Sequence, residues 1–171
     1  MGKSRDNSRR SSLGEDAEGK QNLLYVILEE GSPIFLSRKV RWSGIFISAP
    51  GPDINLNASR GRALEKLKMS VHMLIDPNPG KVPHLIPAYS KESIAIAEAR
   101  RRKKTTRGKR QPRIAVIDVN KIHSKAKHRH LRSLARQFGI SIPRQNWDIS
   151  EYQYVFSHYI PFCAVQDVYR V

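Results

Sequence analysis

The sequence predicts one α+β domain preceded by a polar tail. Apolar, partly β-branched runs typical of strands outnumber the segments with helical periodicity, and they occur on both sides of those segments. The chain has 171 residues, a length typical of one domain, and its 39% of hydrophobic residues is enough for one core. Residues 1–21 are rich in Ser, Arg, Asp, Glu and Gly, which predicts a disordered tail and places the domain at 22–171.

The first half of the domain predicts two strands and a helix. Leu23–Leu28 is a continuous apolar run typical of a buried strand, and Gly44–Ser48 is a second, shorter run that ends before a Pro- and Gly-rich stretch. From Ala63 to Ile75 the apolar residues recur on one helical face, which predicts an amphipathic helix. The Pro-rich residues 76–80 end that helix.

A strand and a second helix follow. His84–Tyr89 is typical of a strand, but Pro87 has no backbone N–H to donate to a ladder. We therefore expect Pro87 at a sheet edge, a bulge or a strand end. Ser90 has the side chain of a good N-cap, so a helix is expected to begin there and to continue through an Ala-rich stretch into a basic run.

The last part of the chain predicts three strands around a short helix. Arg113–Val119 has the clearest strand pattern of the sequence. Leu131–Phe138 has helical periodicity, and Gly139 is placed to end that helix. Tyr152–His158 and Val165–Val171 predict the final two strands.

Positive charge is concentrated in one segment. The net charge is +16, and residues 98–136 contain 15 lysines and arginines against two acidic residues, a local balance of +13. Such a segment can neutralise nucleic-acid phosphates, act as a nuclear-import signal, or be a helix end and loop kept in water by their charge. It contains no Phe, Tyr or Trp that would stack on single-stranded bases. The residues expected to carry nucleic-acid binding or import are Arg100, Arg101, Arg102, Lys103, Lys104, Arg107, Lys109 and Arg110.

Several classes of function find no support in the sequence. The longest apolar run is too short to span a bilayer, and no apolar stretch follows the basic start, so we expect an intracellular protein, with the nucleus as one location. Cys163 is the single cysteine, which excludes an internal disulfide and a cysteine-built zinc site. His128 and His130 lie among basic residues that repel a divalent cation, so no metal site is expected. The P-loop, G-x-G-x-x-G and G-x-S-x-G motifs are missing.

One acidic residue is a candidate for chemistry. Glu151 stands at the opening of the strand-like segment Ser150–Phe156, after residues 146–148, which are expected to form a loop. A carboxylate at a strand edge that borders a cleft can accept a proton or stabilise developing positive charge. A solvated Glu at a strand start has no such role. Both interpretations stay open from the sequence.

The order of segments resembles an uncharacterised fungal-type domain family, over about residues 22–171. The segments that carry the resemblance are Leu24–Leu28, Gly44–Ser48, Ala63–Ile75, Leu85–Ser90, Ala95–Arg102, Ile114–Val119 and Ser150–Pro161. That family is in turn similar to the ADP-ribosyltransferase fold. The resemblance implies split, mostly antiparallel sheets with two to three helices, and a cleft for NAD between two small sheets.

The resemblance also implies which positions would act. One class of these enzymes uses an Arg on the first strand to hold the pyrophosphate or ribose and a Ser on a central strand to order the site. A Glu that opens a later strand stabilises the oxocarbenium-like transition state. Glu151 falls at the Glu position, but Val26 and Pro87 occupy the Arg and Ser positions. The first strand also has no His for the histidine-tyrosine-glutamate version, and Tyr89 and Ser90 are the remaining candidates to contact NAD.

The expected function is therefore a degenerate ADP-ribosyltransferase-like domain, a pseudoenzyme that acts as a binding or interaction module. Catalysis would require another residue, such as Arg38 or Arg41, to replace the missing Arg in space. The alternative is a basic protein that binds the phosphate backbone of nucleic acid through residues 98–136. The expected partner is accordingly an unidentified protein or a nucleic acid.

Overall fold

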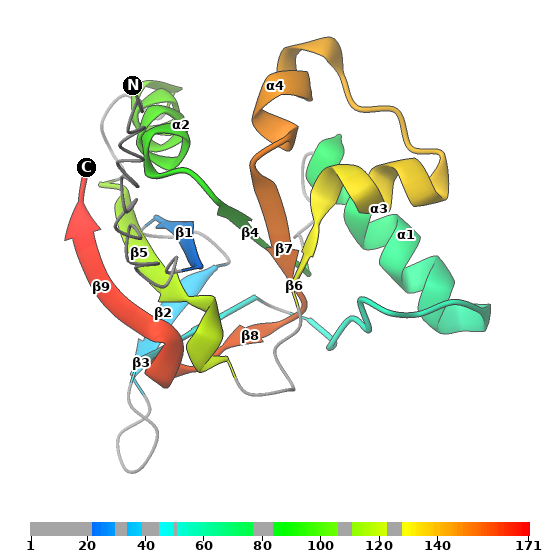
Figure 1. Ribbon diagram of the computed structural model, residues 1–171, viewed down its shortest axis with the longest axis horizontal. Helices are drawn as coiled ribbons and strands as arrows, with labels where there is room; N and C mark the ends of the chain where they lie inside the picture. The colour runs from blue at the N-terminus through cyan, green and yellow to red at the C-terminus, as the bar shows by residue number, and fades with distance from the viewer. Residues whose placement is uncertain are drawn as a thin grey trace, which may run out of the picture.

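Two antiparallel sheets form the centre of the molecule, as the computed structural model shows (Figure 1). The structure describes residues 22–29, 34–38, 45–49, 51–76, 84–105, 111–122 and 128–171. The larger sheet has the order β6-β7-β4-β1-β5-β9, and the smaller sheet has the order β2-β3-β8. All of the paired strands run antiparallel. The chain is thus an α+β protein, as the sequence predicts.

The strands and helices are short. The strands are β1 (Leu23–Leu28), β2 (Phe35–Arg38), β3 (Ile45–Ser48), β4 (Ile86–Tyr89), β5 (Arg113–Asp118), β6 (His128–His130), β7 (Gln153–Phe156), β8 (Tyr159–Ile160) and β9 (Val165–Arg170). The α-helices are α1 (Gly61–Ile75), α2 (Glu92–Thr105), α3 (Leu131–Phe138) and α4 (Trp147–Ser150). The 3-10 turns are η1 (Val119–Lys121), η2 (Arg144–Asn146) and η3 (Phe162–Ala164).

The elements with a strong local pattern are confirmed, and four short ones were not predicted. The described residues contain four α-helices rather than two to three, because residues 147–150 form α4 where a loop was expected. The strands β2, β6 and β8 were also not predicted. Each of these elements has four residues or fewer, too short to establish a period. The tail predicted at 1–21 lies outside the described residues.

Pro87 lies inside the larger sheet, which corrects the expected edge position. It belongs to β4, between β7 and β1, and pairs with Val155 of β7. Pairing between β4 and β1 is limited to Tyr25 opposite Tyr89. A proline can be accommodated here because the β1 side of β4 is paired only at Tyr89, so Pro87 needs no N–H for that ladder.

The start of α2 also differs from the prediction. The carbonyl of Lys91, rather than that of Ser90, accepts the first helical hydrogen bond, from the N–H of Ala95 at 3.2 Å. The backbone N–H of Ser90 instead donates to the carbonyl of Tyr152 at 2.8 Å, and its hydroxyl approaches the same oxygen at 3.4 Å. Ser90 therefore joins the β4 end to the β7 start and does not cap the helix.

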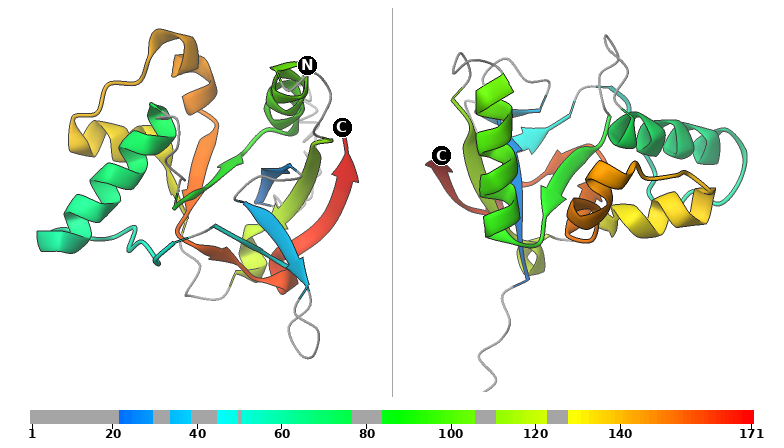
Figure 2. Two further views of the ribbon diagram at one scale, coloured as in Figure 1. Left: turned by 180° about the vertical axis from the view of Figure 1, so that it is seen from behind. Right: turned by 90° about the horizontal axis from the view of Figure 1, so that it is seen from above.

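The two faces of the larger sheet are covered differently. On one face, apolar residues such as Val26, Ala88 and Phe156 pack against the smaller sheet, and all three are fully buried. The other face is covered by helices. Figure 2 shows α2 standing apart from the group formed by α1, α3 and α4. Ala95 and Ala99 of α2 pack on β1 and β5, whereas α1 and α3 pack around Leu85 and Val155.

Both ends of α2 are attached to the C-terminal strand. The hydroxyl of Tyr169 in β9 donates to the carboxylate of Glu92 in the first turn of α2. At the other end, the ammonium group of Lys103 donates to the carbonyl of Val171 at 3.2 Å. These two contacts fix the orientation of α2 on the sheet, and with it the residues that α2 turns toward its neighbours.

Candidate functional site

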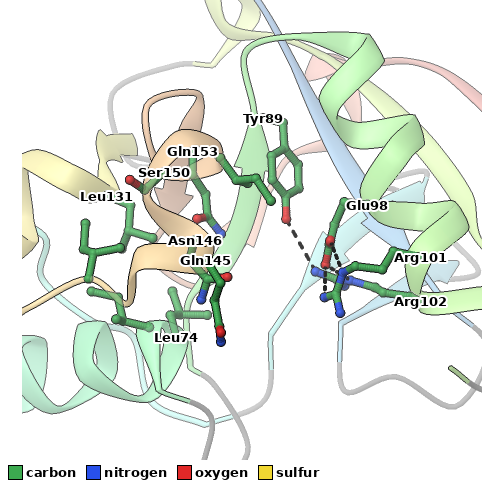
Figure 3. A pocket seen from close by; sticks show the side chains of 13 residues that line it. Leu74, Tyr89, Glu98, Arg101, Arg102, Leu131, Gln145, Asn146, Ser150 and Gln153 are labelled. Atoms are coloured by element: carbon green, nitrogen blue, oxygen red, sulfur yellow. Dashed lines mark hydrogen bonds and ion pairs between the residues drawn. The ribbon is translucent and has the colours of Figure 1, made fainter.

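A cavity of about 590 Å³ lies between α2 and the group formed by α1, α3 and α4 (Figure 3). Its base at the sheet is formed by Tyr89, the last residue of β4, and Gln153, the first residue of β7, which are directly opposite each other in the ladder. The remaining lining residues are Leu74, Ile75, Glu98, Arg101, Arg102, Leu131, Ile142, Gln145, Asn146, Ile149 and Ser150. The volume is within the range of about 300–1,000 Å³ that is typical of small-molecule sites.

The α2 wall of the cavity carries a buried carboxylate held by two arginines. Glu98 is 8% exposed, and its oxygens accept hydrogen bonds from Arg101 Nε at 2.7 Å and Nη2 at 2.8 Å and from Arg102 Nε at 2.9 Å. Arg102 also contacts the Tyr89 hydroxyl at 3.5 Å and the Glu29 carboxylate at 3.5 Å. The two arginines follow Glu98 by three and four positions, a spacing that places them on one helical face.

The ionisation of this cluster follows from its burial and contacts. Burial would raise the pKa of Glu98, but the hydrogen bonds from Arg101 and Arg102 outweigh it and hold that pKa below its usual range. Burial raises the pKa of Tyr89 even though the positive charge of Arg102 opposes the shift. The cavity therefore presents an ionised carboxylate, two guanidinium groups and a neutral phenol near neutral pH.

The opposite wall carries three carboxamides. Gln145 and Asn146 come from η2, and Gln153 comes from the start of β7. Figure 3 shows Gln145 and Asn146 across the cavity from the α2 arginines. The side chains of these three residues form no hydrogen bond with the part of the chain that the structure describes. Each one thus has donors and an acceptor available for a ligand.

The short helix α4 is held in place by Arg132 of α3. The guanidinium of Arg132 donates to the hydroxyl of Ser150 at 3.0 Å and to the carbonyl of Trp147, and it lies 4.5 Å from the centre of the Trp147 ring. The Ser150 hydroxyl, 1% exposed, donates to the same carbonyl at 2.6 Å. Because a four-residue helix is too short to be stable alone, these contacts determine where the α4 wall stands.

Glu151 lies outside the cavity. It follows α4 in a turn, two residues before β7, so it does not open a strand as the sequence predicted. Its side chain is exposed, and its carboxylate forms no hydrogen bond or ion pair among the described residues. Its backbone carbonyl is 2.7 Å from Nε2 of His130, a distance at which the ring N–H donates to it.

The positions matched to the other two enzyme residues lie on opposite faces of the sheet. Val26 packs between the two sheets, whereas Pro87 pairs with Val155, which packs under α1 and α3. Neither residue lines the cavity, and the exposed Ser90 does not line it either. Of the two candidate NAD contacts, Tyr89 alone belongs to the cavity. Arg41 lies outside the described residues, as do the side-chain contacts of Arg38.

The basic segment at 98–136 is divided by the fold. Arg101 and Arg102 turn toward Glu98, and Lys103 donates to Val171. Arg100 and Lys104 are exposed and form no ion pair with a described residue. Farther along, Arg129 donates to the carbonyl of Leu56 at 2.9 Å, and Arg132 holds α4. Arg107, Lys109 and Arg110 lie outside the described residues.

Most of the cavity could not be predicted from the sequence. The Glu98–Arg101–Arg102 cluster had a readable signal, because an acid followed three and four positions later by arginines predicts ion pairs on a helix. Gln145, Asn146 and Gln153 had no signal, since the sequence does not show that η2 and β7 face α2.

Within the described residues, no group of three His, Cys, Asp or Glu side chains is arranged to hold a metal ion. No described helix has the length and apolar character needed to cross a bilayer.

Comparison of the chain with family models, with curated proteins and with solved structures finds no match.

Proposed function

We propose that the protein is a non-catalytic binding module with an ADP-ribosyltransferase-like fold, and that its ligand site is the cavity between α2 and the α1–α3–α4 group. Two separate antiparallel sheets, one of six strands and one of three, support the fold assignment. The observation that carries the assignment as a binding module is the cavity itself: three carboxamides that form no hydrogen bond with a described residue face an arginine pair across about 590 Å³.

The loss of catalysis is supported by where the enzyme positions lie. An NAD cleft between the two sheets would need space beside Val26, but Val26, Ala88 and Phe156 fill that region with apolar side chains that are 0% exposed. Glu151 follows α4, is exposed and does not line the cavity. The residues that would have to act together on one NAD molecule are therefore not gathered at one place.

The first test incubates the full chain with NAD and follows NAD by chromatography and the protein by intact-mass spectrometry. We expect no ADP-ribose on the protein and no consumption of NAD above that of a protein-free control. Consumption of NAD that disappears in Glu151→Gln would overturn the non-catalytic assignment, because that variant removes the one carboxylate retained from the enzyme pattern.

The second test uses anilinonaphthalene sulfonate, a fluorescent probe with apolar rings and one anionic group. We expect a saturable enhancement of the probe's fluorescence. Arg101→Gln should lower the affinity for the probe about tenfold, because one charge-assisted contact is lost. Arg100→Gln is the matched control, since Arg100 neighbours Arg101 on α2 but does not line the cavity. Equal effects of the two variants, or no enhancement, would overturn the assignment of this cavity as the ligand site.

A nucleic-acid-binding function is a second candidate, favoured by one observation. Arg100 and Lys104 are exposed one helical turn apart on α2, with no ion pair to a described residue. If they contact phosphates, affinity for a duplex should fall steeply with salt, and replacing both with Gln should reduce the salt slope by about two. Duplex binding that is absent at low salt, or unchanged in the double variant, would remove this candidate.

A further inference from the structure

The chemistry of the cavity is divided into three zones, and this division restricts the kind of ligand that fits. The inference that follows rests on the proposed function, because it takes this cavity as the binding site. One zone is the charged α2 wall, the second is the carboxamide wall, and the third is apolar. The apolar zone is lined by Leu74, Ile75, Leu131, Ile142 and Ile149.

The charged zone favours an anion at its outer side. The side chain of Arg101 is 65% exposed. Its Nε and Nη2 donate hydrogen bonds to Glu98, and its other terminal nitrogen, Nη1, donates to no described residue. Arg102 is oriented inward by Glu98, Tyr89 and Glu29. Five consecutive basic residues, 100–104, belong to this end of α2. Arg100 and Lys104 among them form no ion pair with a described residue, so the local potential is positive. Arg101 is thus fixed by Glu98 with its remaining donors available at the cavity opening.

The other two zones favour a planar group with both donors and acceptors on its edge. Each carboxamide offers two N–H donors and one carbonyl acceptor, a pattern that forms paired hydrogen bonds with the edge of a heterocyclic base. Gln145 and Asn146 are adjacent on η2, and Gln153 is the first residue of β7. The isoleucine and leucine side chains provide an apolar surface against which a flat ring can lie.

We propose that the cavity binds a nucleoside monophosphate, with the base against Gln145, Asn146 and Gln153 and the phosphate at Arg101. A phosphate alone would leave the carboxamides and the apolar zone without partners. A nucleoside alone would leave Nη1 of Arg101 without an acceptor among the described residues. The ligand class follows from the need to satisfy both ends of one cavity with a single small molecule.

Isothermal titration calorimetry of the full chain with AMP, CMP, adenosine and inorganic phosphate tests this inference. We expect at least one monophosphate to bind about tenfold or more tightly than adenosine and than phosphate, because each of those lacks one of the two contacts. Arg101→Gln should weaken the binding of the monophosphate without changing the affinity for adenosine. Methionine is similar in size to glutamine but lacks its amide hydrogen-bonding groups. Gln153→Met should therefore lower the affinity for the monophosphate and for adenosine alike.

Controls separate this inference from the function on which it rests. Arg100→Gln should leave all four titrations unchanged, and circular dichroism of each variant establishes that it is folded. If the sulfonate probe binds in an Arg101-dependent way but no monophosphate displaces it, the ligand class is wrong and the site stands. If probe binding does not depend on Arg101, the site itself is wrong. If AMP and inorganic phosphate displace the probe at the same concentration, the nucleoside part of the inference would also be overturned.

Discussion

The two faces of the larger sheet differ in how completely they are packed. Between the sheets, side chains from both layers are apolar and close together, and the residues at the centre, such as Val26 and Phe156, have no exposed surface. Under the helices, α2 occupies one half of the sheet and α1 with α3 occupies the other. The gap between these two halves is the cavity. The first face thus maintains the fold, and the second leaves the space that we propose as the ligand site.

A substitution on the packed face should have the largest effect. Phe156→Ala removes a fully buried ring, and the free energy of unfolding should fall by about 3–5 kcal/mol, because the loss of apolar burial adds to the cost of the cavity left behind. Urea denaturation measures the change. Phe162→Ala is the control, because that ring is 47% exposed and its removal should cost far less. A cost below about 1 kcal/mol for Phe156→Ala would indicate that the ring is not tightly packed between the two sheets.

The buried ion cluster gives the next largest effect and a dependence on pH. Glu98→Gln removes the carboxylate that pairs with Arg101 and the nearer of the two that pair with Arg102, which keeps Glu29 at 3.5 Å. The free energy of unfolding near neutral pH should therefore fall by about 3 kcal/mol. The pKa of Glu98 is lowered in the folded chain from an ordinary value of 4.5. The stabilisation by the Glu98 carboxylate is therefore fully present above pH 4.5, and it is lost as the pH falls through the pKa of Glu98 in the folded chain.

Denaturation of the wild type and the Glu98→Gln variant over a pH series measures this dependence. The stability difference between the two should shrink as the pH falls below 4.5. Glu65→Gln is the control, because that side chain is 69% exposed and its one ion pair with a described residue is to Lys68 on the surface. A stability difference that does not change with pH would mean that the Glu98 carboxylate is not the stabilising group.

The α4 wall should show the smallest change in stability. Arg132→Ala removes two hydrogen bonds and the contact with Trp147, at a cost of about 1–2 kcal/mol, and it should alter the fluorescence of Trp147. Arg136→Ala is the matched control, since Arg136 is exposed one turn farther along α3. If the two variants have the same fluorescence, Arg132 does not hold the wall.

Elements with a sufficiently long local pattern could be predicted from the sequence. The apolar run of β1, the helical periodicity of α1 and the glycine that closes α3 each lie within one segment, and all three are confirmed. Gly139 adopts a φ of 65°, as expected of a helix-ending glycine. The strand β6 could not be predicted, because His128–His130 is polar in sequence and forms a strand only by pairing with β7.

The candidate site divides in the same way. The Glu98 cluster is encoded by the spacing of its residues along one helix, so that spacing alone is enough to predict its ion pairs. The rest of the cavity is built from residues of β4, β7, α1, α3, α4 and η2, which are far apart in the sequence. The match of Glu151 to a catalytic position followed its place in the order of segments, and this order does not determine which way a side chain faces.

The sequence by itself determined the class of fold, the main helices and strands, and the charge of the α2 end, because each depends on neighbours within one segment. The tertiary structure decided that Val26 and Pro87 face opposite ways and that Tyr89 meets Gln153. It also decided that two of the basic residues line a cavity. The physical reason is that side chains alternate between the faces of a strand, so strand pairing and register determine which distant residues share one space.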